Sequence, residues 1–109
     1  MGTKTRFPGF SQYENERVDT TFWDDFSIAD GFGPDAVLDT FGRAFGEWKS
    51  NHKYLTELVL VLNHKLWQHY ELGDEAMARL YDNLWHRANN WGMEKLKGDE
   101  LKFFLWVLD

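Results

Sequence analysis

Residues 51–74 read NHKYLTELVLVLNHKLWQHYELGD, and this stretch decides the fold class. Apolar residues recur along it at intervals of three and four, which is the period of one face of an α-helix. They are Leu55, Leu58, Val59, Leu62, Leu66 and Tyr70. Ser50 or Asn51 can cap the start of such a helix, and Gly73 can stop it just after Glu71. The stretch therefore predicts one long amphipathic helix whose apolar face lies in a core.

The same period continues on the C-terminal side of this stretch. Asp74 can cap a further helix, and Gly98 follows the end of that helix. Its apolar face consists of Met77, Leu80, Tyr81, Leu84, Ala88 and Trp91. Asp99 can then cap a short last helix. The apolar residues at helical spacing in it are Leu101, Phe104, Leu105 and Leu108. Two more helices are therefore expected after Gly73.

Two helices are also expected on the N-terminal side. The first begins at Thr20 or Thr21, whose hydroxyls can cap it, and it ends at Gly31. Pro34 suits the first position of the second helix, because a proline there gives up no hydrogen bond. The apolar stripe of this second helix consists of Leu38, Phe41, Phe45 and Trp48.

Gly42 and Gly46 lie four residues apart beside that stripe. Glycine weakens a helix by about 1 kcal/mol relative to alanine, so two glycines in one helix need a reason. A pair of small residues at this spacing allows a second helix to come close. We therefore expect another helix to pack against Gly42 and Gly46.

The chain has 109 residues, which is enough for one hydrophobic core and too few for two. No alternating apolar run bounded by turn residues predicts a strand, and the short joints favour antiparallel neighbours. The sequence therefore predicts an all-α fold, a single compact bundle of four to five helices at residues 19–109. Residues 1–18 are polar, contain Pro8 and Gly9 and lack an apolar period, so we expect a flexible N-terminal segment there.

The composition argues against several classes of protein. Cysteine is absent, which removes disulfides, thiol nucleophiles and thiolate metal sites. The net charge is −6 although residues 1–18 carry +1, so direct nucleic-acid binding is not expected. The longest apolar run, Leu58 to Leu62, is far shorter than the roughly 18 residues of a membrane helix. The opening residues lack the apolar region of a signal peptide, so a cytoplasmic protein is expected.

Six aspartates, and no Lys, Arg or His, lie between Asp19 and Asp39. Four of them fall at the start of a predicted helix, where a carboxylate meets the positive end of the helix dipole. These are Asp19, Asp24, Asp25 and Asp35. Helix starts do not explain Asp30, near the end of its helix, or Asp39, a turn into the next. The alternatives are a carboxylate surface for Lys and Arg of a partner, or a cation site that lacks the EF-hand spacing.

Few residues suggest catalysis. His64 and His69 are about 140° apart around a helix, so they do not form a metal pair on one face. A metal site completed by His86 is one alternative among many. The sequence GFGPDA at residues 31–36 has the form of a dinucleotide-binding fingerprint, but it follows a helix where that motif needs a strand. We therefore expect a protein that is not an enzyme and uses no cofactor.

Six tryptophans are many for a chain of this length: Trp23, Trp48, Trp67, Trp85, Trp91 and Trp106. A bulky core with some indoles at its edge is one explanation. The other is an aromatic interaction face, since Trp and Tyr dominate binding interfaces, and Trp23 and Trp106 are its candidates. The run from Phe103 to Leu108 is apolar on every side and must be covered by the chain's own core or by a second chain. Both a monomer and a homodimer stay open.

Three stretches carry a resemblance to known proteins: FWDDFSIADGFG at residues 22–33, DAVLDTFGRAFGEWKSNHKYLTELVLVLNHKLW at residues 35–67, and LKGDELKFF at residues 96–104. Together they make residues 22–109 resemble a group of small acidic proteins that conjugative elements and prophages of gut bacteria carry. In length, acidity and lack of cysteine the chain is also similar to type II-A anti-CRISPR proteins. The resemblance implies a bacterial host cell and a protein partner.

Two functions follow from these expectations. The first is a stoichiometric inhibitor of a CRISPR effector nuclease, a basic protein partner of type II, that acts through an acidic surface. Its expected partner-binding residues are Asp24, Asp25, Asp30, Asp35, Asp39, Trp23 and Trp106. The alternative is an accessory or regulatory protein of the mobile element that assembles with itself or another element protein. That assembly would use aromatic faces and be sensitive to Trp106 or Phe103.

Overall fold

The computed structural model describes residues 21–108 of the chain. The flexible segment predicted at residues 1–18 and the predicted cap Thr20 lie outside the described residues. Within the described part the chain is helical and contains no strand, which confirms the all-α prediction. No helix of this part is both long enough and apolar enough to span a membrane.

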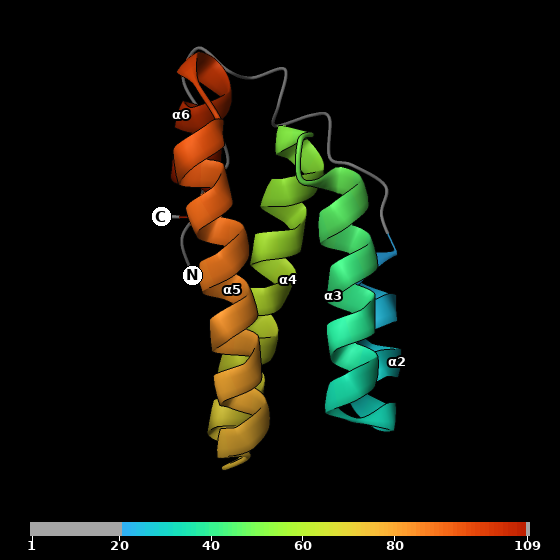
Figure 1. Ribbon diagram of the computed structural model, residues 1–109. Coiled ribbons are helices and arrows are strands. Elements are labelled where there is room, and N and C mark those ends of the chain that lie inside the picture. Colours follow the sequence, from blue (N-terminus) through green and yellow to red (C-terminus); the bar gives the residue numbers. More distant parts are fainter. Residues whose placement is uncertain (1–20, 109) are drawn as a thin grey trace.

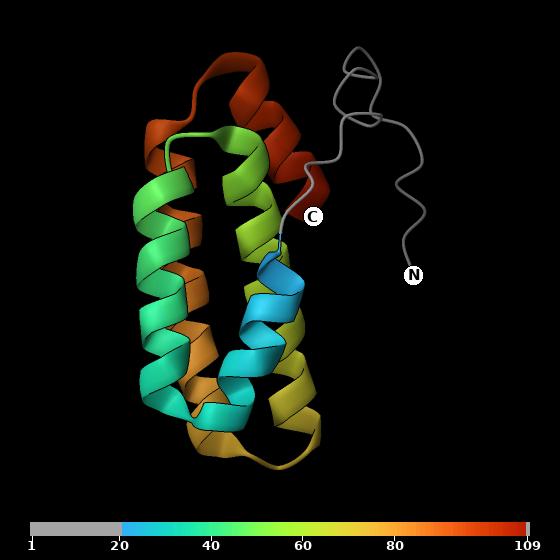
Figure 2. The same cartoon turned by 90° about the vertical axis from the view of Figure 1, so that its right-hand side faces the viewer.

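The described part contains five helices: α2 (Phe22–Phe32), α3 (Pro34–Trp48), α4 (His52–Glu71), α5 (Glu75–Lys95) and α6 (Gly98–Leu108). Figures 1 and 2 show α2 to α5 running along the long axis as two hairpins, α2 with α3 and α4 with α5. The turns within these hairpins lie at one end of the bundle, and the α3–α4 turn and α6 lie at the other. The predicted bundle of four to five helices is confirmed.

Two of the predicted helix caps are confirmed. The Asn51 side chain accepts hydrogen bonds from the backbone N–H groups of Lys53 and Tyr54, at 3.1 and 3.4 Å. The Asp74 carboxylate accepts one from the N–H of Met77 at 3.2 Å. Each bond satisfies an N–H group that the first turn of a helix leaves without a partner, so these residues fix where α4 and α5 begin.

Two other predicted caps differ from the structure. Thr21 is the N-cap residue of α2, as predicted, but its side chain bonds to no backbone N–H group, and its hydroxyl donates to the Asp25 carboxylate at 2.8 Å. The last helix begins at Gly98, so Asp99 lies in its first turn instead of at the cap position. At that position the Asp99 carboxylate still lies near the positive end of the helix dipole, and this interaction stabilises the helix.

The hairpin turns depend on glycines in the left-handed region of backbone conformation. Gly33, with a φ of 111°, is the single residue between α2, which ends at Phe32, and α3, which begins at Pro34. Gly73, with a φ of 79°, lies in the turn between α4 and α5. Only glycine adopts these angles without steric cost, so both turns are sharp and each hairpin is antiparallel.

Helix α4 lies at the centre of the core and packs against α2, α3, α5 and α6. Its fully buried residues are Leu55, Leu58, Val59, Val61 and Leu62. The other helices each contribute a fully buried side chain, which are Phe26, Val37, Tyr81 and Phe104. Three residues of the predicted apolar faces are exposed instead: Leu38, Tyr70 and Leu105. The faces of their helices turn away from the core at those positions.

The predicted close approach of a helix at Gly42 and Gly46 is wrong. Both glycines are exposed, and a Cβ built on either would meet nothing within 4 Å. The close approach occurs at Gly92 of α5, where a Cβ would lie 2.5 Å from Cζ of Phe104. Gly92 is buried and gives the Phe104 ring of α6 its place against α5.

Three of the tryptophans, Trp48, Trp85 and Trp91, pack against the edge of the core, while Trp23 and Trp67 are exposed. None of the six is fully buried. The Trp91 indole N–H donates to the backbone carbonyl of Lys49 at 3.1 Å, just past the end of α3. The Trp48 ring stacks on Tyr54 with centroids 4.1 Å apart. Both rings pack against the core, and the polar edge of Trp91 bonds a carbonyl at a helix end.

Candidate functional site

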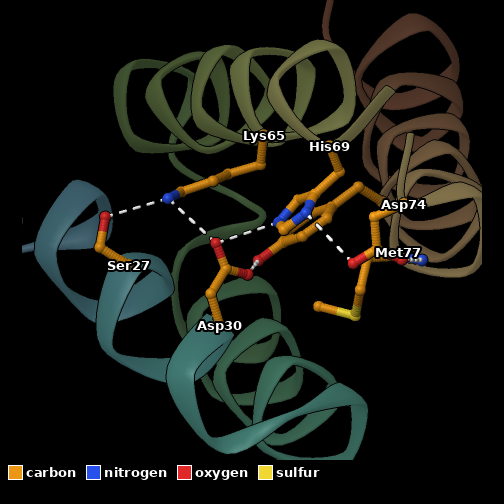
Figure 3. A network of polar contacts seen from close by, with 7 residues as sticks. Ser27, Asp30, Lys65, His69, Asp74 and Met77 are labelled. Carbon is orange, nitrogen blue, oxygen red and sulfur yellow. Dashed lines mark hydrogen bonds and ion pairs between the residues drawn. The ribbon is translucent and has the colours of Figure 1, made fainter. Parts of the chain in front are cut away.

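A polar cluster joins α2, α4 and α5 around Asp30 (Figure 3). Asp30 lies in the last turns of α2 and points toward the other two helices. Its carboxylate is 3.1 Å from Nζ of Lys65 and 3.2 Å from Nε2 of His69, and it accepts a hydrogen bond from the Tyr81 hydroxyl. Nζ of Lys65 also donates to the Ser27 hydroxyl at 3.0 Å. These five residues are called the polar cluster from here on.

The polar cluster holds a charged carboxylate in a largely buried place. Side-chain exposure is 17% for Asp30 and 7% for Lys65. Burial raises the pKa of Asp30. The hydrogen bonds from Tyr81, Lys65 and His69 together lower it by more than burial raises it, so the pKa lies below its ordinary value. Burial and the neighbouring Asp30 raise the pKa of Tyr81, which stays protonated and donates. The cluster is therefore a largely buried ion pair between helices, in which the Asp30 carboxylate has three partners, while Nδ1 of His69 is buried without a hydrogen bond.

The position of Asp30 changes its predicted role. Its charge is engaged within the chain, whereas the sequence-based expectation placed it on a partner-binding surface. No polar-cluster residue lines either of the two grooves described in the next paragraphs. The sequence carried two signals for the cluster. One is an aspartate at the wrong end of a helix, and the other is Lys65, one residue from Leu66 on the apolar face of the long helix predicted at residues 51–71. Tyr81 was expected only as a core residue.

A shallow groove of about 260 Å³ lies between α2 and α3. We call it the acidic groove; its lining residues are Asp25, Ile28, Ala29, Phe32, Ala36, Asp39, Thr40 and Arg43. The structure thus brings Asp25 from α2 and Asp39 from α3 to one concavity. Asp24 and Asp35 are exposed on the same two helices but do not line it.

The acidic groove combines its carboxylates with exposed apolar side chains. Ile28 is 62% exposed and Phe32 is 80% exposed, high values for residues of this kind. Arg43 is the basic residue of the lining, and its guanidinium lies 3.5 Å from the Thr40 hydroxyl. A surface of this kind can contact the aliphatic stem of a Lys or Arg side chain while carboxylates bind the charged end.

The two tryptophans named as partner-binding residues do not join the acidic groove. The indole N–H of Trp23 donates to Oε2 of the buried Glu57 at 2.6 Å, and its ring meets His64 edge-on at 5.2 Å. Trp106 is half-buried on α6, with its ring centroid 6.5 Å from that of Phe103. Helix α6 lies at the other end of the bundle from the α2–α3 turn (Figure 2).

The histidines are dispersed among separate contacts. His69 belongs to the polar cluster, and its Nδ1 lies 3.7 Å from Asp74. His64 packs on Trp23, and His86 lies 3.4 Å from Asp82 on α5. Among residues 21–108, no three or more His, Asp or Glu side chains gather as a metal ion would need.

A second groove, of about 550 Å³, lies between α4 and α5 near their turn. Its lining residues are Leu66, Trp67, Tyr70, Gly73, Glu75, Ala78, Arg79 and Asp82. We call it the aromatic groove, because Trp67 and Tyr70 are 55% and 65% exposed on it. No sequence-based expectation named it: Tyr70 was assigned to the core, and Trp67 was only one of six tryptophans.

Comparison of the chain with protein-family models, curated proteins and solved structures finds no match. Because no known protein indicates a function, the proposals below rest on the two grooves.

Proposed function

We propose that this chain is a non-enzymatic interaction protein that binds a basic protein partner through the acidic groove. The observation that supports the proposal most is the presence of Asp25 and Asp39 in one concavity beside exposed Ile28 and Phe32. Carboxylates alone attract any cation weakly. Carboxylates next to exposed apolar residues favour a protein surface, where Lys or Arg side chains bring both charge and an aliphatic stem.

The partner that we propose is a type II CRISPR effector nuclease, in the cytoplasm of a bacterial host cell. Such an enzyme holds nucleic acid in a positively charged channel. A protein with net charge −6 that presents carboxylates to this channel competes with phosphates for the same Lys and Arg residues. One molecule of the chain would then inhibit one molecule of the nuclease by occupying its channel, with no catalysed reaction and no cofactor.

The test is DNA cleavage by a panel of type II nucleases, titrated with the chain at two salt concentrations. We expect inhibition that saturates near one chain per nuclease and weakens as salt rises, because salt screens the groove charges. Absence of inhibition across the panel would contradict the nuclease as partner.

A matched pair of variants tests the acidic groove itself. The groove variant carries Asp25→Asn and Asp39→Asn, the two carboxylates of the groove lining. Asp30 is left unchanged because the polar cluster needs it. The control variant carries Glu94→Gln and Asp99→Asn, two exposed carboxylates outside the groove lining. We expect at least about tenfold weaker inhibition from the groove variant, which is about 1.4 kcal/mol, and little change from the control. Equal loss in both variants would point to net charge instead of the groove.

A further inference from the structure

Three charged residues of α5 lie along one wall of the aromatic groove, Glu75, Arg79 and Asp82, and His86 continues their row beyond the groove lining. Glu75, Arg79, Asp82 and His86 follow one another on α5 at intervals of four, three and four residues. This spacing places them on a single stripe of the helix, and all four side chains reach solvent. Among residues 21–108, no carboxylate lies within ion-pair distance of the Arg79 guanidinium, which leaves this charge available to another chain. Asp82 lies 3.4 Å from Nε2 of His86 on the same helix, but both side chains are partly exposed and can also reach a second chain.

The charge row is self-complementary. If two α5 helices lie antiparallel with a two-fold axis midway between Arg79 and Asp82, Arg79 of each copy faces Asp82 of the other. The same axis places Glu75 of each copy opposite His86 of the other. Each contact therefore occurs twice, as an interface between identical surfaces requires. A parallel arrangement in the same register would place like charges opposite one another.

The other wall of the groove supplies the apolar part of such a contact. Trp67 and Tyr70 project from α4 with ring centroids 5.6 Å apart. Large exposed aromatic side chains beside a concavity are typical of interface anchors. The small residues Gly73 and Ala78 line the same groove and leave room for side chains of a second helix.

We propose that the aromatic groove is a homodimer interface, in which α5 helices of two copies pack antiparallel and the Trp67 and Tyr70 rings of each copy cover the other. The occupant is a second copy because the charge row matches itself under a two-fold axis. This interface is separate from the acidic groove, so the dimer could present two acidic grooves. The proposal does not depend on the nuclease as partner.

The test is the mass of the chain in solution as a function of concentration, by sedimentation equilibrium at physiological salt. We expect a reversible dimer of twice the 12.9 kDa of one chain. Arg79→Glu places two carboxylates opposite each other, and Asp82→Arg places two guanidinium groups opposite each other. Each variant alone is therefore expected to be monomeric. An equimolar mixture of the two restores both ion pairs and is expected to give a heterodimer.

Controls separate this interface from general effects of charge and from loss of folding. Lys102→Glu and Glu94→Arg change the net charge by the same amounts at exposed positions outside the groove and should leave the dimer intact. Circular dichroism of both interface variants should show wild-type helix content. A wild-type chain that stays monomeric at every concentration would overturn the proposal. So would a dimer that both single variants retain, because it would use another surface.

Discussion

At the scale of single residues, Asp30 is the side chain whose role the structure changes most. A carboxylate near the C-terminal end of a helix opposes the helix dipole, which is unfavourable for an exposed residue. Here the cost is offset by Lys65, His69 and Tyr81, which reach Asp30 from two other helices. The residue therefore helps to fix how α2 sits on the α4–α5 hairpin.

The first prediction concerns Asp30→Asn. The variant is expected to lose about 3 kcal/mol of unfolding free energy, because Lys65 stays buried without its counter-charge. Urea unfolding of wild type and variant measures the difference. Asp39→Asn, at an exposed position inside α3, is the control and should change stability by about 0.5 kcal/mol at most. A loss no larger than that of the control would mean that the polar cluster does not stabilise the fold.

The second prediction concerns the acid limb of stability. The folded-state pKa of Asp30 lies below its ordinary value of 3.8, so near that pH the unfolded chain binds more protons than the folded chain. The contribution of Asp30 is therefore complete above this ordinary value and is lost as the pH falls through the folded-state pKa. We expect the stability difference between wild type and Asp30→Asn to shrink between about pH 5 and pH 2. Urea unfolding across this range measures it, and a difference that stays constant would contradict the assignment.

At the scale of helices, glycines inside a helix have opposite effects on stability, depending on whether they face solvent or another helix. Gly42 and Gly46 face solvent from α3, where the absence of a side chain only weakens the helix. Gly92 is buried in α5, where the absence of a side chain admits the ring of Phe104. The spacing of Gly42 and Gly46 suggested a close helix contact that does not exist. The contact at Gly92 is identified only by the packing of α6 on α5.

The third prediction therefore compares alanine at these positions. Gly42→Ala and Gly46→Ala should each raise the free energy of unfolding by about 0.5 to 1 kcal/mol, through helix propensity. Gly92→Ala should lower it by about 1 to 3 kcal/mol, since its Cβ would lie 2.5 Å from the Phe104 ring. Thermal unfolding of the three variants gives the signs directly. A stabilising effect of Gly92→Ala would contradict the close packing of α6 on α5.

At the scale of the whole molecule, α6 closes the end of the bundle opposite the two hairpin turns (Figure 1). The sequence left open whether the chain's own core or a second chain covers the apolar C-terminal run. The chain's own core buries Phe103 and Phe104, while Leu105 remains exposed. Two neighbouring aromatic side chains of α4, Trp67 and Tyr70, are exposed instead, so self-assembly is better sought there than at Trp106.

The fourth prediction tests this closure. Phe104→Ala should cost about 3 to 5 kcal/mol of unfolding free energy, because it opens a cavity where α5 and α6 meet. Leu105→Ala is the matched control on the same helix and should cost far less, since its side chain is already half in solvent. Denaturant unfolding of both variants is the measurement. Equal costs would mean that α6 does not belong to the core.

The sequence by itself determined the helices, because helix formation depends on near neighbours. Periods of three and four residues, the caps Asn51 and Asp74, and the stop at Gly73 all act within one or two turns. Tertiary structure alone decided which surface each helix presents to its neighbours. Asp30 meets Tyr81 across 51 positions of the chain, and Gly92 admits Phe104 from the next helix. The two grooves likewise arise only where helices lie side by side, so no local pattern could reveal which residues share them.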